Sequence, residues 1–193
     1  MIISEGMRRF MGEVKEVEKR IDISLHVTSE LSKEVIFYRE EYMKEKLVIE
    51  LRSDSLDKTI AQATIILIPN DMVALYDEID ERTYDCSRRL GKVVKLLFDN
   101  YTEHDERRTK LLNSQDGYIA YLEQIWVDEN YRNKGIASLL MENIFFLIQR
   151  GGGISVSGIT MVPVSSARKF FENHGAFSLS EEVLCIYKNI FMK

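Results

Sequence analysis

The sequence predicts a single α/β domain whose central sheet is mixed and mostly antiparallel, and three features of the 193 residues support this. Segments with alternating or β-branched residues dominate both ends of the chain, and a strand, helix, strand, helix unit lies between them. The chain is 45% hydrophobic and 30% charged, which is enough apolar material for one core. Its two prolines, Pro69 and Pro163, and the lack of a Ser/Gly/Pro-rich stretch leave no linker to divide residues 1–193.

Residues 1–117 are expected to contribute strands and helices ahead of any motif. Apolar residues at helical spacing predict an amphipathic helix over residues 5–17. Strand-like patterns follow over residues 20–27, 35–38, 46–51 and 59–68. The polar segment RSDSLDK separates the last two patterns, so we expect them to form an antiparallel hairpin.

The middle and the C-terminal part alternate between helix and strand. A period near 3.6 predicts helix between residues 72 and 101 with a break near Gly91, and the charged segment 103–110 is expected to be a solvated loop. The central strand is predicted over Tyr118–Val127. The next helix is predicted over 136–149 and ends at Gly151, Gly152 and Gly153. The remaining elements are a strand over 154–162, a helix over 165–173, and closing strands over 176–180 and 183–191.

Charge and cysteine content narrow the class of protein. A net charge of -5 without any Lys/Arg-rich block argues against a nucleic-acid binder, because phosphate neutralisation needs a concentrated basic face. Cys86 and Cys185 are far apart and belong to no Cys/His cluster, so we expect no metal site and no disulfide. No signal-peptide core or bilayer-spanning apolar run is present, which predicts a soluble, cytoplasmic protein that does not bind a membrane.

One motif carries chemistry. The segment VDENYRNKGIASLL, residues 127–140, places Arg132, Gly135 and Ala137 in the pattern R-x-x-G-x-A between the central strand and its helix. The first amides of a helix lack intrahelical acceptors, and the helix dipole adds about half a positive charge there, so this turn suits a pyrophosphate. Glycine lets an anion approach the backbone, and Arg132 and Lys134 add positive charge.

The same spacing also occurs where an ordinary α/β unit joins a strand to a helix, so a purely structural turn is the alternative. The segment matches neither the Walker pattern G-x-x-x-x-G-K-[ST] nor the G-x-G-x-x-G of dinucleotide folds. Nucleotide hydrolysis and hydride transfer are therefore poorly supported.

Two segments together resemble a known family. LEQIWVDENYRNKGIASLLMENI, followed by VSSARKFFENHGAF, is similar to the core of the GCN5-related N-acetyltransferase (GNAT) superfamily over residues 118–187. The resemblance implies a GNAT-like sheet flanked by helices and splayed at its central strands, which opens a cleft for an acyl thioester. The usual helices after the first strand are reduced here, with helix expected at 72–101 instead, so the acceptor site is the least predictable part.

The resemblance implies acetyl-CoA as co-substrate and no metal. The backbone of Ile125, Trp126 and Val127 would pair with the pantetheine arm like an added strand. The pyrophosphate would be held by the amides of Arg132, Asn133, Lys134, Gly135, Ile136, Ala137 and Ser138.

Glu123 is the candidate catalytic base. It is a carboxylate in a strand that otherwise reads YIAYL and IWV, and related acetyltransferases use a Glu four places before the Val of this motif. An amine with a pKa near 10 is mostly protonated at neutral pH, so a base is needed to free its lone pair. The alternative is that Glu123 faces solvent or pairs with a basic side chain on a neighbouring strand.

The second helix departs from the family pattern. Phe171 belongs to the implied cofactor site at a point where many members carry a Tyr that protonates the leaving thiolate. Tyr131, His174, Tyr187 or a water are the substitutes we consider for that proton donor. Val164 replaces an Asn that contacts pantetheine in many relatives.

Three polar residues of this helix have simpler roles. Ser165 and Ser166 are expected to cap its first amides. His174 is expected to cap its C-terminus, where a cation meets the helix dipole favourably.

The function that the resemblance implies is N-acetyl transfer to an amine of a small molecule or peptide by direct attack. The alternative is a non-catalytic acyl-CoA-binding or protein-interaction module, which Phe171 and Val164 favour and Glu123 opposes. The acidic balance mildly favours a cationic acceptor such as a polyamine, an aminoglycoside or lysine. GNAT proteins often pair through their C-terminal strands, so a homodimer is one arrangement the resemblance allows.

Overall fold

The computed structural model describes residues 24–35, 41–53, 56–70, 88–98, 106–112 and 117–188. The helix predicted over 5–17 lies outside these ranges, as do the first part of the segment 72–101 and the outer residues of several predicted strands. None of the helices in the described part of the chain is long and apolar enough to cross a bilayer.

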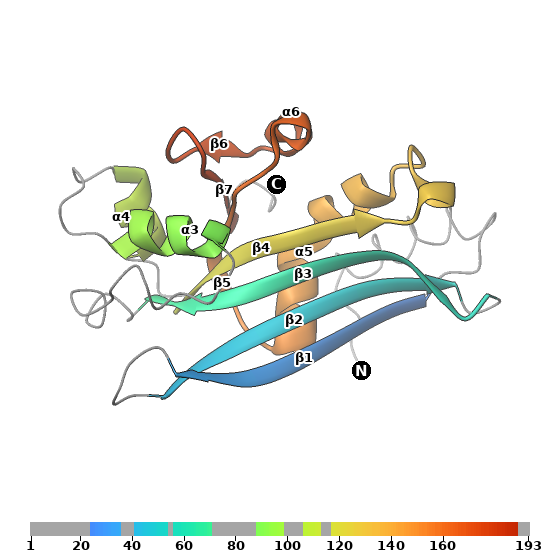
Figure 1. Ribbon diagram of the computed structural model, residues 1–193, viewed down its shortest axis with the longest axis horizontal. Coiled ribbons are helices and arrows are strands. Elements are labelled where there is room, and N and C mark those ends of the chain that lie inside the picture. The colour runs from blue at the N-terminus through green and yellow to red at the C-terminus, as the bar shows by residue number, and fades with distance from the viewer. Residues whose placement is uncertain are drawn as a thin grey trace.

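The described strands form one seven-stranded sheet in the order β1-β2-β3-β4-β5-β7-β6 (Figure 1). Every neighbouring pair is antiparallel except β4 and β5, which are parallel, so the mixed, mostly antiparallel sheet is confirmed. The predicted hairpin is also confirmed, with Leu47 opposite Ile65. The strands are β1 Ser24–Val35, β2 Glu41–Ser53, β3 Lys58–Pro69, β4 Tyr118–Val127, β5 Val156–Met161, β6 Phe177–Ser178 and β7 Leu184–Tyr187.

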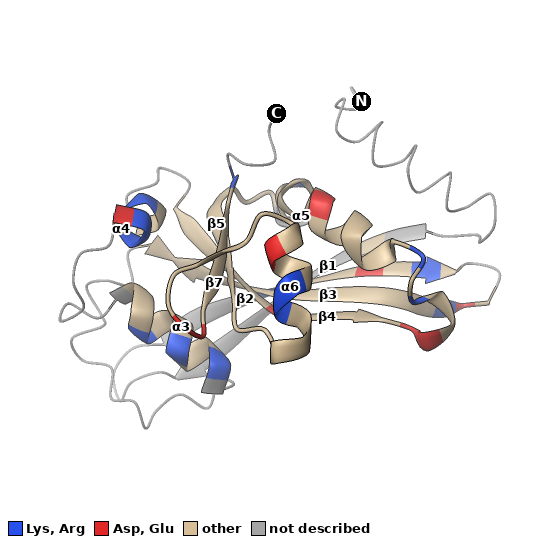
Figure 2. Ribbon diagram, turned by 90° about the horizontal axis from the view of Figure 1, so that it is seen from above, with Lys and Arg blue, Asp and Glu red and all other residues tan. Residues whose placement is uncertain are grey.

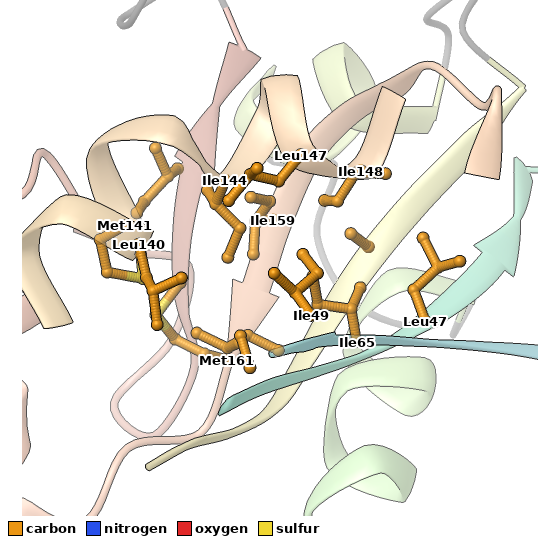
Figure 3. Packing of buried hydrophobic residues seen from close by; sticks show 14 of the residues in the cluster. Leu47, Ile49, Ile65, Leu140, Met141, Ile144, Leu147, Ile148, Ile159 and Met161 are labelled. Atoms are coloured by element: carbon orange, nitrogen blue, oxygen red, sulfur yellow. The ribbon is translucent and has the colours of Figure 1, made fainter. Parts of the chain in front are cut away.

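Helices cover both faces of this sheet and define two cores. The helices are α3 Arg88–Phe98, α4 Glu106–Leu112, α5 Ile136–Gly152 and α6 Ser165–Asn173. On one face, α5 packs against the sheet, and we call this cluster of buried residues the α5-side core. Ile144 of α5 belongs to it together with Ile49 and Ile65 of the sheet (Figure 3). On the other face, α3 and α4 form the α3/α4-side core, which includes Ile66 and Tyr121. Adjacent residues of β3 enter opposite cores because side chains alternate along a strand.

Two helix predictions need correction. The break expected near Gly91 is wrong, because Gly91 lies inside the continuous helix α3, whose buried face of Leu90, Val93 and Leu97 packs on the sheet. The loop expected over 103–110 is wrong from residue 106 onward, where α4 begins. Arg108 explains this second error: it is buried, and its Nε donates a 2.7 Å hydrogen bond to the Leu97 carbonyl.

The predicted helix after the central strand is confirmed, although it continues further than expected. Gly151 and Gly152 still belong to α5, and Gly153 ends the helix in the left-handed region with φ 68°. Its N–H donates to the Gln149 carbonyl, as in a glycine C-cap.

Both α3 and α4 carry Lys and Arg residues (Figure 2).

Gly158 of β5 is required by close packing, and we expect Gly158→Ala to destabilise the protein by about 1–3 kcal/mol. A Cβ there would lie 2.5 Å from Leu111 Cδ2 and 3.0 Å from the Ile186 carbonyl oxygen. Denaturant unfolding measures the loss. Gly91→Ala is the matched control, because its Cβ meets nothing within 4 Å and helix propensity should make it stabilising by about 0.5–1 kcal/mol. Equal stability of the two variants would contradict this account.

Candidate functional site

The sheet opens along β4. β5 pairs with β4 only through Tyr118, Ala120 and Tyr121, and the rest of β4, from Leu122 to Val127, pairs with β3 alone among the described strands. The closed end is fastened by two side chains, since Thr160 Oγ1 donates to the Ala120 carbonyl and Ser157 Oγ to the Tyr118 carbonyl. The predicted splay at the central strands is therefore present.

Glu123 lies at a β-bulge beside this opening. In the β3–β4 register, Ile65 faces Leu122 and Thr64 faces Gln124, so Glu123 has no residue opposite it. Such a bulge bends a strand locally and redirects the side chain at that point. Its carboxylate is partly exposed and lies 3.7 Å from Lys46 Nζ. The alternative predicted a basic partner on a neighbouring strand; the basic partner is present, but it lies on β2, one strand beyond the neighbour β3.

The register identifies the face that Glu123 uses. Lys46 stands opposite Ile66, and Ile66 stands opposite Tyr121, and both of these belong to the α3/α4-side core. Lys46, and with it the Glu123 carboxylate, therefore lies on that face. The first residue of α5, Ile136, is buried in the core on the opposite face. A ligand that contacts both the Glu123 carboxylate and the start of α5 must pass from one face of the sheet to the other. It can do so where β4 separates from β5.

The turn after β4 is held by Asp128. Its backbone N–H donates to the Ile60 carbonyl, and its carboxylate accepts from Asn130 N and pairs with Lys58 Nζ. The hydrogen bond from Lys58 lowers the pKa of the Asp128 carboxyl, and the same bond raises the pKa of Lys58. A short 3-10 turn, η2 Glu129–Tyr131, follows this cap. Asp128 therefore fixes the direction in which the chain leaves β4.

The R-x-x-G-x-A segment forms the start of α5 as predicted. Gly135 is the N-cap residue, with φ 79° in the left-handed region, and a Cβ built there meets nothing within 4 Å. Asn133 is also left-handed, at φ 61°. Leu139 is the first amide bonded back to the Gly135 carbonyl, which leaves the amides of Ile136, Ala137 and Ser138 without intrahelical acceptors. A run of free donors therefore lies beside the open position at Gly135.

The other predicted cofactor residues surround this helix start. Arg132 and Lys134 are exposed; Arg132 Nε donates to the Val127 carbonyl, and Lys134 Nζ lies 5.0 Å from the centre of the Tyr131 ring. On β4, Ile125 and Val127 pack against the α5-side core, while Trp126 is 36% exposed. Trp126 stands opposite Gln62, on the face that carries Glu123.

A family comparison agrees with this geometry. The model of a family described as "Acetyltransferase (GNAT) domain" matches residues 91–175, a span that begins in α3 and includes the opened strand, the left-handed glycine and α6. Residues 91–175 are thus similar to a GNAT acetyltransferase domain. The resemblance found in the sequence is thereby confirmed.

Two solved structures are similar to this chain, each with a TM-score of 0.44. One is AtaTR bound with AcCoA, at 9% identity over 76% of this chain and 69% of that one. The other is the Drosophila melanogaster polyamine N-acetyltransferase, which forms N-acetylagmatine, at 15% identity over 72% and 74%. No curated protein matches the chain.

The second helix of the GNAT core, α6, matches its predicted bounds of 165–173. Phe171 is only 5% exposed and belongs to the α5-side core, where its ring meets Phe170 edge-on at 5.2 Å. The predicted caps Ser165 and Ser166 are wrong: Val164 is the N-cap residue, and no side chain bonds the first amides. Both serines are exposed, so water can satisfy those amides instead.

The proposed substitutes for the missing Tyr differ in their availability. Tyr187 donates its hydroxyl to the Arg107 carbonyl at 2.7 Å, on the α4 side of the sheet. His174 places Nδ1 2.7 Å from the Phe170 carbonyl and its backbone N–H on the Phe171 carbonyl, so its predicted role as C-cap is confirmed. Tyr131, at the turn that leads into α5, packs partly against the α5-side core.

Two features of this candidate site were missed by sequence reasoning. Lys46 carried no signal as the partner of Glu123, because its reach depends on a register across three strands. Asp128 and Lys58 were also missed, although an Asp directly before a helical turn is a recognisable capping signal. In the described residues, no three His, Cys, Asp or Glu side chains lie close enough together to hold a metal ion.

Proposed function

We propose that the chain is an acetyl-CoA-dependent N-acetyltransferase that moves an acetyl group to an amine by direct attack. One observation carries the proposal. The strand that separates from β5 leads directly into a left-handed Gly135 and the unbonded first amides of α5. An open strand edge and an anion-binding helix start are the two surfaces that a pantetheine arm and a pyrophosphate require.

The residues present fit coenzyme A. The amides from Arg132 to Ser138 would hold the pyrophosphate, with Arg132 and Lys134 adding charge-assisted contacts from their exposed positions. The backbone from Ile125 to Val127 pairs with β3 alone among the described strands, and its other edge would bond the pantetheine amides. Phe171 would contribute apolar surface beneath the site from the α5-side core. When bound, acetyl-CoA supplies the activated acetyl group.

Glu123 would act as the base. Its carboxylate lies on the sheet face opposite α5, so an amine approaching from that face reaches the opening from the side away from the cofactor cradle. Glu123 would accept a proton from the acceptor ammonium, directly or through a water, and free the lone pair for attack. A backbone N–H near Ile125 would stabilise negative charge on the acetyl oxygen. A water or a nearby hydroxyl would protonate the thiolate.

Direct transfer is favoured over an intermediate linked to Cys185. Cys185 is fully buried in the α3/α4-side core, and desolvation raises the pKa of its thiol, so the reactive thiolate is disfavoured.

A second candidate function is a non-catalytic acyl-CoA-binding module. Two observations favour it: Phe171 offers a buried phenyl ring where many relatives have a hydroxyl, and Val164 presents an exposed apolar side chain at the start of α6.

Thiol release from acetyl-CoA tests the proposed function. The full chain would be incubated with acetyl-CoA and a panel of amino acids, amines, aminoglycosides and peptide N-termini, with CoA binding measured in parallel by calorimetry. Acceptor-dependent release supports the transferase. Tight binding without release for any acceptor supports the binding module, and neither binding nor release removes both.

A further inference from the structure

The charges nearest the proposed base form an opposed pair. Lys46 Nζ and Glu123 Oε2 are 3.7 Å apart, and the two side chains are 37% and 30% exposed. This separation exceeds that of a direct N–H···O hydrogen bond, and partly exposed pairs of this kind contribute little to stability. A ligand with its own charges can therefore separate the two groups at low cost.

The pair determines which charges an acceptor should carry. An acceptor ammonium that donates its proton to Glu123 comes close to the Lys46 ammonium, and like charges at this distance repel. A carboxylate on the same acceptor, a few bonds from the amine, would instead attract Lys46. The ion pair between Lys46 and Glu123 is then replaced by two pairs, ammonium with Glu123 and carboxylate with Lys46, and no charge is left unpaired.

On β2 and in the turn after it, the two acidic side chains that the structure describes already have partners. Arg52, also on β2, pairs with Asp57 at 3.0 Å, and Glu50 accepts a hydrogen bond from Thr59 Oγ1. The described acidic side chains of these elements therefore offer no unpaired carboxylate to a second ammonium beside Lys46.

We propose that the acceptor is a zwitterion of the amino-acid type, whose ammonium is deprotonated at Glu123 while its carboxylate binds Lys46. This inference rests on the proposed function and specifies the substrate class of the same site. The net charge of the chain suggested a cationic acceptor, whereas the pair of Lys46 and Glu123 favours a zwitterionic one. Lys46 is then a specificity-determining residue, because it contacts the acceptor away from the bond that forms.

The test compares matched acceptors. Each amino acid in a panel of several side chains would be assayed beside its carboxamide and its decarboxylated amine, which differ only at the acid group. Kinetics would be measured for the wild type, Lys46→Met and Lys46→Arg. Lys92→Met is the control variant, because Lys92 is an equally exposed lysine that pairs with Glu182 on another part of the molecule.

We expect the wild type to prefer the amino acid in kcat/KM by about 10- to 100-fold, the usual value of a hydrogen bond to a charged group. Lys46→Met should remove this preference mainly through KM, Lys46→Arg should retain part of it, and Lys92→Met should retain all of it. Equal or better use of decarboxylated amines by the wild type, or a preference that survives Lys46→Met, overturns the zwitterion proposal while N-acetyl transfer stands. Absence of transfer to every amine, with CoA bound, overturns both.

Discussion

Replacing Glu123 by Gln should lower kcat for N-acetyl transfer at neutral pH by about 10²- to 10⁴-fold, the range that a positioned general base supplies. The amide keeps the size of the side chain at the bulge and loses the ability to accept a proton. Coenzyme A affinity should remain near the wild-type value, because Glu123 lies on the sheet face opposite the start of α5. Steady-state kinetics and calorimetry with CoA separate the two effects.

Glu142→Gln is the matched control for this variant. Glu142 is an exposed carboxylate on α5, and the same substitution there should change neither kcat nor CoA affinity. Raising the pH should partly restore Glu123→Gln, since more of the acceptor is then deprotonated in solution. Turnover of Glu123→Gln that equals the wild type at every pH would remove Glu123 from the mechanism.

Local sequence patterns predicted the parts of the fold whose stability depends on local chemistry. The hairpin of β2 and β3, the strand Tyr118–Val127 and the helix α6 follow from side-chain period and turn residues. Helix α4 was missed because its charged sequence has the composition of a loop. A tertiary contact, the buried Arg108 on the Leu97 carbonyl, stabilises it as helix.

The candidate site also has a part that could be predicted from local sequence and a part that depends on tertiary contacts. The turn at Gly135 was predictable because a glycine and a helix start are adjacent in the chain. The bulge at Glu123 and the contact with Lys46 were not, because each arises from the pairing of β4 and β2 with β3. The acceptor preference proposed for this site therefore depends on the register of strands, and net charge alone points to a different acceptor.

Gly135→Ala should weaken coenzyme A binding by about 10- to 100-fold, equivalent to losing one charge-assisted hydrogen bond to the pyrophosphate. Apart from its chain neighbours, the added Cβ meets no atom of the described residues within 4 Å, so it projects into the space beside the helix amides. It also has to adopt φ 79°, which L-residues disfavour by about 1–2 kcal/mol. Calorimetry with CoA measures the affinity, and denaturant unfolding measures the strain.

The same helix provides the control that separates strain from binding. Gly153 ends α5 at φ 68°, and a Cβ there also meets nothing within 4 Å, so Gly153→Ala has the same backbone strain at the other end. The two variants should lose similar stability, and only Gly135→Ala should lose CoA affinity. If both bind CoA equally well, the cradle is not at Gly135. If both lose affinity equally, the effect is a general loss of stability, and the amides of α5 have no special part in binding.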